Sequence, residues 1–216
     1  MIELPIGLNA ELVPLSWLLG VWEGTGVLDY QNGDEKITRS FGQRVSFSQD
    51  GLPHLNYSSY AWLLPEDGAD VDASADVSAD ASAESSLPLA TETGYWRLSR
   101  PLTDADPGPG LLPGSEPRPF TTVDEVESLR NKTDGFDIEV SIVHPGGVME
   151  LYIGQVAAAR IDLATDAVMR SHGAKEYTAA TRMYGLVQGH LLWAWDIAAL
   201  GQPIKTHASA RLAKVD

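Results

Sequence analysis

The chain has 216 residues, of which 44% are hydrophobic, and a formal net charge of −15. This length and composition predict one folded domain with a full core, and an acidic surface without any run of Lys or Arg argues against a nucleic-acid partner. The absence of cysteine excludes disulfides, thiolate catalysis, cysteine-bound zinc and iron–sulfur clusters.

The N-terminal segment shows no targeting signal. Residues 1–6 lack the basic and apolar regions of a signal peptide, and no apolar run approaches the roughly 20 residues that a bilayer needs. We therefore expect a cytoplasmic protein without membrane contact. Residues 10–19 form the one stretch with helical character, and Pro14 limits it to a turn or two.

The first predicted strand opens with a glycine-rich motif, Gly20-Val21-Trp22-Glu23-Gly24-Thr25-Gly26. The two-residue period of a strand puts Gly20, Trp22, Gly24 and Gly26 on one face. Glycines inside a strand usually mark a bend or a close backbone approach. We expect Trp22 to close the floor of a barrel, as the first-strand tryptophan does in lipocalin-like proteins. A purely structural role is the simplest interpretation of the glycines.

Most of the remaining chain has the pattern of short strands separated by Gly or Asp/Asn turns. The predicted strands cover 21–30, 35–48, 55–64, 94–99, 136–144, 148–156, 160–164, 167–171, 179–187, 191–198 and 206–214. A meander of this length hides its edges best by closing on itself. The predicted fold class is all-β: an antiparallel up-and-down β-barrel of about ten strands, calycin/lipocalin-like, with a short N-terminal helical turn.

Two stretches interrupt the strand pattern. Residues 66–88 contain Asp-Ala-Ser-Ala repeats, and residues 103–119 contain five prolines. The acidic repeat has too few large apolar side chains to offset the entropy of ordering, so we expect a mobile loop. Because strand-like sequence resumes on each side, we interpret both stretches as insertions at hairpin tips of a single domain over residues 1–216.

The last predicted strand begins with Gln202-Pro203-Ile204-Lys205-Thr206-His207. In a chain without cysteine, an iron ligand is His, Met or Tyr, and neutral imidazole is the commonest choice. A strand start is a suitable place, since a flat macrocycle can enter at a barrel rim. Alternation, however, groups His207 with Ser209 and Arg211, opposite the more apolar Ala208 and Leu212, so an inward His207 requires a distorted rim.

The two motifs, Gly20–Gly26 and Gln202–His207, resemble those of the nitrobindin family, haem-binding β-barrels related in shape to fatty-acid-binding proteins. The resemblance covers 16–64, 92–97 and 136–214, and is closest to the actinobacterial branch. It implies one haem b per chain, with His207 as proximal iron ligand and so as the catalytic and metal-binding residue. The family's Tyr-Pro-Thr after the glycine motif is replaced by residues 29–32, so haem contacts from the first turn are left open.

The resemblance also implies an activity. Ferric haem in this family binds nitric oxide and converts peroxynitrite to nitrate, so we expect a haem-dependent peroxynitrite isomerase whose partners are these small molecules. An isomerisation conserves all atoms and requires no acid–base residue. A non-haem barrel that binds an apolar ligand such as a fatty acid is the alternative, and a nitric oxide carrier or sensor is a third. The oligomeric state is left open, with a homodimer as one outcome.

Other polar residues receive weaker assignments. Lys175 and Arg182 are cations that could meet haem propionates, with a plain surface charge as the alternative. Four histidines beside predicted turns are expected to be exposed: His54, His144, His172 and His190. Glu139 and Glu150 lie on neighbouring predicted strands and could pair as carboxylates across a hairpin, but a solvated outer barrel face explains them more simply. Core or pocket-lining positions are expected for Tyr177, Met183, Trp193 and Trp195.

Overall fold

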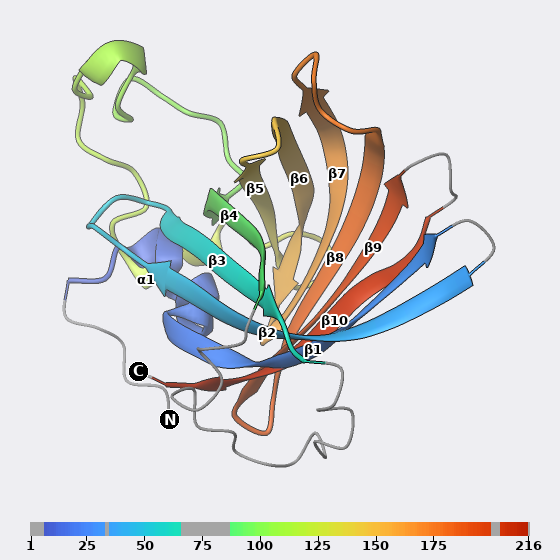
Figure 1. The fold of residues 1–216 in the computed structure, drawn as a ribbon. Helices are drawn as coiled ribbons and strands as arrows, with labels where there is room; N and C mark the ends of the chain where they lie inside the picture. Colours follow the sequence, from blue (N-terminus) through green and yellow to red (C-terminus); the bar gives the residue numbers. More distant parts are fainter. Residues whose placement is uncertain (1–6, 33–34, 66–86, 200–203, 216) are drawn as a thin grey trace.

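The computed structural model describes residues 7–32, 35–65, 87–199 and 204–215. Within these ranges the chain forms one closed antiparallel barrel, in the ring order β1-β10-β9-β8-β7-β6-β5-β4-β3-β2 (Figure 1). The strands are β1 (Gly20–Asn32), β2 (Glu35–Ser48), β3 (Leu55–Leu63), β4 (Leu87–Leu98), β5 (Phe136–His144), β6 (Val148–Ala157), β7 (Arg160–Arg170), β8 (Tyr177–Val187), β9 (His190–Ala199) and β10 (Lys205–Lys214). The predicted fold class is confirmed.

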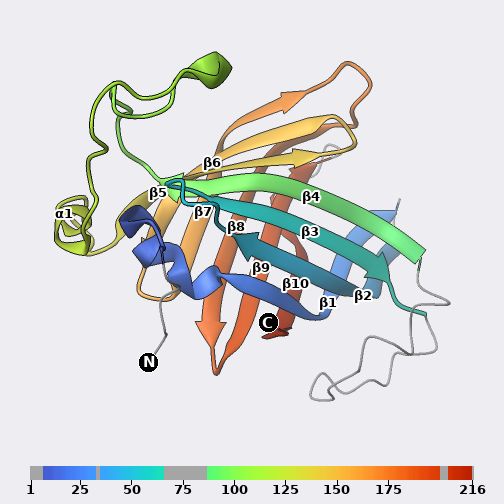
Figure 2. The same cartoon turned by 90° about the vertical axis from the view of Figure 1, so that its left-hand side faces the viewer.

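In the described part of the chain, three short helices lie outside the barrel wall: η1 (Ala10–Leu18), η4 (Pro109–Leu111) and α1 (Val123–Glu127). The 3₁₀ helix η1 contains Pro14, in keeping with the predicted short helical turn. Figure 2 shows η1 and α1 together at one end of the barrel. We call this end the floor, and the opposite end, where β10 begins, the mouth. None of the helices in the described ranges is long and apolar enough to cross a membrane.

The strand boundaries differ from the prediction in two places. The two strands predicted at 160–164 and 167–171 are one strand, β7, with an irregularity in its pairing to β6 near Thr165 and Ala167. β4 begins at Leu87 rather than near Gly94, so Leu87 and Pro88 of the predicted insertion already belong to it. The first half of β4 pairs with β3 alone, since its pairing to β5 starts at Thr93. Pro88 is tolerated there because the strand has a free edge.

The two predicted insertions have different outcomes. Residues 66–86 lie outside the described residues. Residues 103–119 form an irregular excursion between β4 and α1 that contains η4 and projects beyond the barrel wall (Figure 1). Both stretches join strands that are neighbours in the ring.

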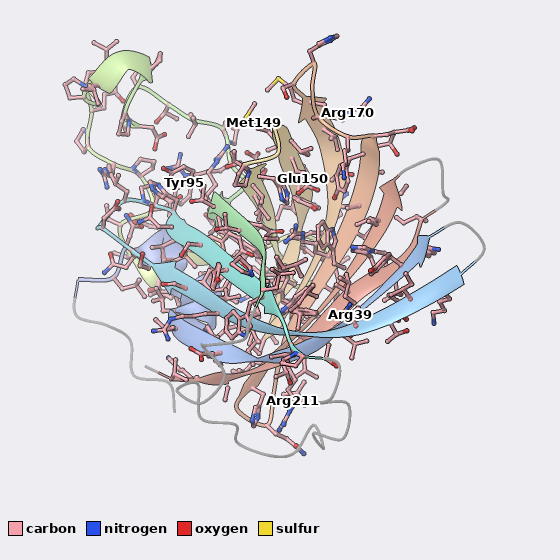
Figure 3. The ribbon with its side chains drawn as sticks, viewed as in Figure 1. Arg39, Tyr95, Met149, Glu150, Arg170 and Arg211 are labelled. Carbon is pink, nitrogen blue, oxygen red and sulfur yellow. The ribbon has the colours of Figure 1, made fainter. Side chains whose placement is uncertain are left out.

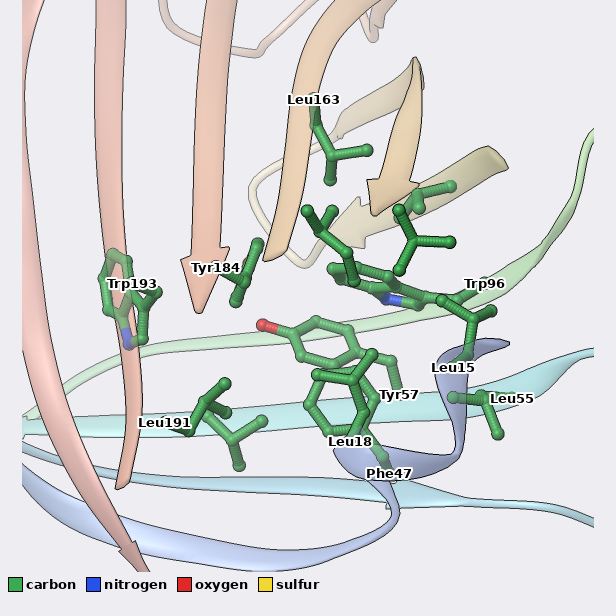
Figure 4. Packing of buried hydrophobic residues seen from close by; sticks show 14 of the residues in the cluster. Leu15, Leu18, Phe47, Leu55, Tyr57, Trp96, Leu163, Tyr184, Leu191 and Trp193 are labelled. Carbon is green, nitrogen blue, oxygen red and sulfur yellow. The ribbon is translucent and has the colours of Figure 1, made fainter. Parts of the chain in front are cut away.

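The floor is closed by η1, whose Leu12, Leu15 and Leu18 side chains are fully buried. Figure 4 labels Leu15 and Leu18 in this packing. The Trp22 indole N–H donates to the Leu18 carbonyl at 2.7 Å. This bond ties the helix to the first strand, as expected for a tryptophan that closes the floor. It also satisfies a carbonyl at the end of the helix that has no partner within it.

Aromatic rings fill the lumen above η1. Trp96 is at their centre: its ring centroid lies 5.4 Å from that of Phe47, 5.9 Å from that of Tyr57 and 5.1 Å from that of Tyr184 (Figure 4). The Phe47 and Tyr184 contacts are edge-to-face, which is a favourable arrangement for aromatic pairs. The lower half of the barrel is therefore a packed core, and any ligand site must lie nearer the mouth.

The glycine motif makes the tight contacts expected of it. A Cβ atom on Gly26 would lie 2.4 Å from the Ser209 carbonyl oxygen and 2.5 Å from the Phe41 ring. Gly20 has φ of +119°, a conformation that side chains rarely allow. The motif therefore shapes the junction of β1 with its two neighbours.

One buried ion cluster, the floor network, connects η1 to the loop after β4. The Arg100 guanidinium binds Glu11 on η1 at 2.6 and 3.0 Å, and Asp106 in the loop at 2.8 and 2.7 Å. All three side chains are buried. Asp106 also accepts the backbone N–H of Thr103.

Candidate functional site

The mouth brings together residues from strand ends that are distant in sequence. His144 ends β5, Tyr177 begins β8, and His207 lies near the start of β10. β7 and β8 pair only from Arg160 to Ala164, although both continue toward the mouth. The barrel wall thus lacks regular pairing between β7 and β8 at this end.

His207 is turned by a β-bulge. The pairing of β10 with β9 shifts register between Thr206 and Ala208, so His207 is the residue without a partner in that ladder. Its ring makes an edge-to-face contact with Trp195 of β9, with centroids 5.7 Å apart. This is the rim distortion that simple alternation required, because a bulge re-aims the side chain of the extra residue.

The imidazole of His207 is kept neutral and oriented. Burial lowers its pKa, and a hydrogen bond with the Asp29 backbone opposes that effect without cancelling it. Because this bond favours the protonated ring, the Asp29 group must be its carbonyl, which accepts a hydrogen bond. One ring nitrogen of His207 is therefore held as an N–H donor. The other nitrogen is then a free lone pair, the form in which imidazole binds a metal.

A second buried ion cluster, the lumen network, consists of Glu92, Glu150, Arg182 and His144. The Arg182 guanidinium binds both Glu92 carboxylate oxygens at 2.9 Å and lies 3.6 Å from Glu150. His144 Nε2 lies 2.7 Å from Glu150 Oε2. Figure 3 labels Glu150 on β6, in the upper part of the barrel.

Tyrosines complete this cluster. The hydroxyls of Tyr152 and Tyr177 both donate to Glu150 Oε1, and the Tyr57 hydroxyl donates to Glu92 at 2.9 Å. Every carboxylate in the lumen thus accepts several hydrogen bonds, as buried charges require.

Both carboxylates of the lumen network are ionised. Burial raises the pKa of Glu92, but the Arg182 charge and hydrogen bonds outweigh it and hold that pKa at about 2. Burial likewise raises the pKa of Glu150, while the bond to His144 and the charge of Arg182 lower it further than burial lifts it. For Arg182, burial acts to lower the pKa, and the charge of Glu92 raises it well above its ordinary value. One cation therefore faces two anions.

Trp195 connects the lumen network to His207. The Arg182 Cζ atom lies 4.3 Å from the centroid of the indole, and the His144 ring stacks on the indole at 6.2 Å with an interplanar angle of 10°. The buried Trp195 Nε1 has no hydrogen-bond partner within the described ranges, a property it shares with Trp17 and Trp96. His144 and His207 thus contact the same indole.

Several predicted placements were wrong. His144 is not exposed beside a turn but lies in the lumen, with 19% of its side chain accessible. Glu150 is not on the outer face but is buried inside the barrel. There its carboxylate accepts hydrogen bonds from Tyr152 and Tyr177 and lies close to His144 and Arg182. Glu139 does lie on the outer wall, where it pairs with Arg97. Met183 is 42% exposed on the outer wall, since its neighbour Arg182 takes the inward position.

The two cations expected near haem propionates lie in different surroundings. Lys175 is exposed in the β7–β8 loop at the mouth. Arg182 is only 3% exposed, and Glu92, Tyr152 and Glu150 already surround its guanidinium. Of the two cations, only Lys175 is exposed at the mouth.

The residues at the mouth fit a haem. No group of three or more His, Cys, Asp or Glu that could hold a metal ion occurs in the described part of the chain. A single histidine is sufficient for an iron that brings the four ligands of a macrocycle with it. His207 meets the requirements of this role: its ring is neutral, its second nitrogen is hydrogen-bonded to the Asp29 backbone, and it lies at the rim.

Fold and site together therefore define a closed antiparallel barrel whose mouth residues fit a haem. The chain belongs to the family described as "THAP4-like, heme-binding beta-barrel domain", whose profile matches residues 11–214.

Relatives and a solved structure agree with this assignment. The chain is 65% identical over the full length of both proteins to the peroxynitrite isomerase of Clavibacter michiganensis. It is 51% identical to that of Paenarthrobacter aurescens, covering 99% of this chain and 98% of the relative. The crystal structure of Rv2717c from M. tuberculosis shares the fold, with a TM-score of 0.62 at 23% identity, over 99% of this chain and 100% of that one.

Proposed function

We propose that this chain binds one haem b through His207 and isomerises peroxynitrite to nitrate, and that it also binds nitric oxide. The observation that carries the proposal is the inward turn of His207 at the bulge, with one ring nitrogen bound to the Asp29 carbonyl. The names of the full-length relatives support the choice of reaction.

When bound, ferric haem supplies a Lewis-acidic iron that polarises the peroxide oxygen of the substrate. His207 would hold the iron, and the Asp29 carbonyl would fix the tautomer and ring direction of that histidine. The Trp195 indole packs edge-to-face against the His207 ring. These residues bind and orient, which is sufficient for a reaction that conserves all atoms of the substrate.

Lys175 is our candidate for a contact with the haem propionates. It is exposed on the β7–β8 loop at the same end of the barrel as His207, and its backbone carbonyl accepts a hydrogen bond from Arg170 at 3.3 Å. An ammonium at the rim can meet a carboxylate without desolvation of either group.

The test is haem titration of the purified protein followed by absorbance spectroscopy and stopped-flow decay of peroxynitrite. We expect a Soret band, nitrate as product, and a loss of at least about a hundredfold in haem affinity for His207→Ala, since even partners of metal ligands can cost that much. His172→Ala is the matched control, because His172 is an exposed histidine at the same mouth. An unchanged Soret band in His207→Ala would contradict the proposal.

Two other outcomes identify the alternatives. A normal Soret band with nitric oxide binding, but no acceleration of peroxynitrite decay, indicates a carrier or sensor. No Soret band, with a fatty acid in an organic extract, indicates a barrel for apolar ligands. The charged lumen network disfavours this last alternative, because an apolar chain entering the upper lumen would meet buried carboxylates.

A further inference from the structure

Trp195 contacts both His207 and the lumen network. The centroid of its indole lies 5.7 Å from that of the His207 ring, with an interplanar angle of 84°. The Arg182 Cζ atom lies 4.3 Å from the same indole centroid. One aromatic side chain thus connects the candidate iron ligand to the buried charges.

The His207 ring has two restraints. A hydrogen bond with the Asp29 backbone fixes one ring nitrogen, but a single hydrogen bond leaves the plane of the ring free to turn about its direction. The edge-to-face contact with Trp195 defines that plane, since aromatic rings favour this arrangement. The second restraint matters because His207 lies at a β-bulge, where the ladder to β9 leaves it without a partner.

The indole of Trp195 is itself held by its neighbours. The Arg182 guanidinium binds both Glu92 oxygens at 2.9 Å and donates to the Tyr152 hydroxyl at 3.0 Å, so the position of the cation is fixed. A cation that is withdrawn from water binds an aromatic face more strongly than an exposed one. The His144 ring stacks on the indole with an interplanar angle of 10°.

The cost of burying charge supports a role for this arrangement. Arg182, Glu92 and Glu150 are largely withdrawn from water, and buried ion pairs often contribute no more stability than apolar side chains of similar volume. A fully hydrogen-bonded cluster does, however, hold its neighbours in one arrangement. The neighbour that extends this order toward His207 is Trp195.

We propose that Trp195 is a positioning residue for His207, and that the lumen network holds the Trp195 indole in place through Arg182. With its plane fixed, the imidazole keeps its free nitrogen in one direction. Less freedom is then lost when that nitrogen binds a metal. The purpose of the positioning rests on the proposed haem site, but the positioning itself is a property of the haem-free chain.

The first test is nuclear magnetic resonance of the haem-free protein at mildly alkaline pH, with His207 assigned by comparison with His207→Ala. The ¹⁵N shifts of the imidazole distinguish one held neutral tautomer from exchange between both. We expect one tautomer in the unmodified protein and in Trp195→Phe, which retains an aromatic ring. In Trp195→Leu we expect the averaged shifts of a free histidine, because the ring turns away from Asp29 into water.

Haem affinity is the second measurement. Trp195→Leu should bind haem about tenfold more weakly, as is usual after loss of a group that orients a metal ligand, and Trp195→Phe should recover to within about twofold. Trp62→Leu is the matched control. It makes the same change on the outer wall, where Trp62 stacks on Tyr60, and it should alter neither haem affinity nor the His207 tautomer.

A double-mutant cycle tests the contribution of Arg182. If Arg182 acts through the indole, Arg182→Met combined with Trp195→Leu should weaken haem binding no more than Trp195→Leu alone. Additive losses would overturn the link from the lumen network to Trp195. If Arg182→Met does not fold, Arg182→Lys takes its place, because it keeps the charge beside Glu92 and removes the planar group over the indole.

The outcomes separate this proposal from the proposed function. A single His207 tautomer in Trp195→Leu overturns the positioning role and leaves the haem site intact. If Trp195→Leu does not fold, nuclear Overhauser contacts between the Trp195 and His207 rings of the unmodified protein decide: their presence supports the proposal, and their absence overturns it. Failure of the unmodified protein to bind haem overturns the proposed function, whereas a held His207 tautomer that depends on Trp195 still supports the positioning.

Discussion

The two buried ion clusters of this barrel contain the same charged groups and are used differently. The floor network places Arg100 between Glu11 and Asp106, and the lumen network places Arg182 between Glu92 and Glu150. In the floor network, the additional partner is the backbone N–H of Thr103. In the lumen network, the additional partners are three tyrosine hydroxyls and a histidine.

This difference shows what turns a structural ion cluster into part of a site. A peptide N–H cannot change its charge and only fixes a loop. An imidazole can carry a proton, and it can offer a second nitrogen to a ligand. Both clusters join distant parts of the chain, because Glu11 and Arg100 are 89 residues apart and Glu92 and Arg182 are 90 residues apart.

The largest expected effect comes from removal of each arginine. Arg100→Met and Arg182→Met each leave two buried carboxylates without their cation, so each should lower the free energy of unfolding by about 3–5 kcal/mol. Urea denaturation of the haem-free proteins measures this. Haem titration of the same variants separates the clusters, because only Arg182→Met should alter the Soret band.

The floor variant is the control for the lumen variant in this comparison. If Arg100→Met weakens haem binding as much as Arg182→Met does, the loss reflects general destabilisation, and the lumen network has no specific connection to the haem site.

Acid should weaken the two clusters over overlapping pH ranges. The pKa of Glu92 in the folded protein is about 2 against an ordinary value of 4.5, and that of Asp106 is about 2 against 3.8. Their contributions are complete above those ordinary values and are lost as the pH falls toward 2. The free energy of unfolding should then decrease by about 1.4 kcal/mol per pH unit for each proton taken up on unfolding.

Substitution of each carboxylate shows which group causes the pH dependence of the free energy of unfolding. Glu92→Gln should flatten the stability curve below pH 4.5, and Asp106→Asn should flatten it below pH 3.8, in urea denaturation measured from pH 6 to pH 2. A Glu92→Gln curve parallel to that of the unmodified protein would show that the carboxylate is not held ionised by Arg182.

The smallest effect is expected for Tyr177→Phe. It removes one hydrogen bond to Glu150 at the mouth, where water can replace it, so stability should fall by about 1 kcal/mol. Tyr60→Phe, on the exposed outer wall, is the control and should be neutral in the same denaturation experiment. A loss well above that of a single hydrogen bond would mean that Tyr177 also holds Glu150 and His144 in position.

Much of the fold was predictable because it depends on local patterns. Strand periods, turn residues and the Gly20–Gly26 motif predicted the meander, its closure and the floor position of Trp22. The first half of β4 was missed, since Pro88 and Glu92 make Leu87–Thr93 unlike a strand. Its pairing with β3 overrides that weak propensity.

The sequence by itself limited an iron ligand to His, Met or Tyr, because the chain has no cysteine, and only the resemblance of Gln202–His207 to the nitrobindin motif pointed to His207. Only the tertiary structure decided that His207 faces the lumen, since a bulge reverses the alternation that had turned it outward. It alone placed Arg182, Glu150 and His144 inside as well. An inward charge is stable only beside its compensating partner, and here the partners come together only when distant strands close into the barrel.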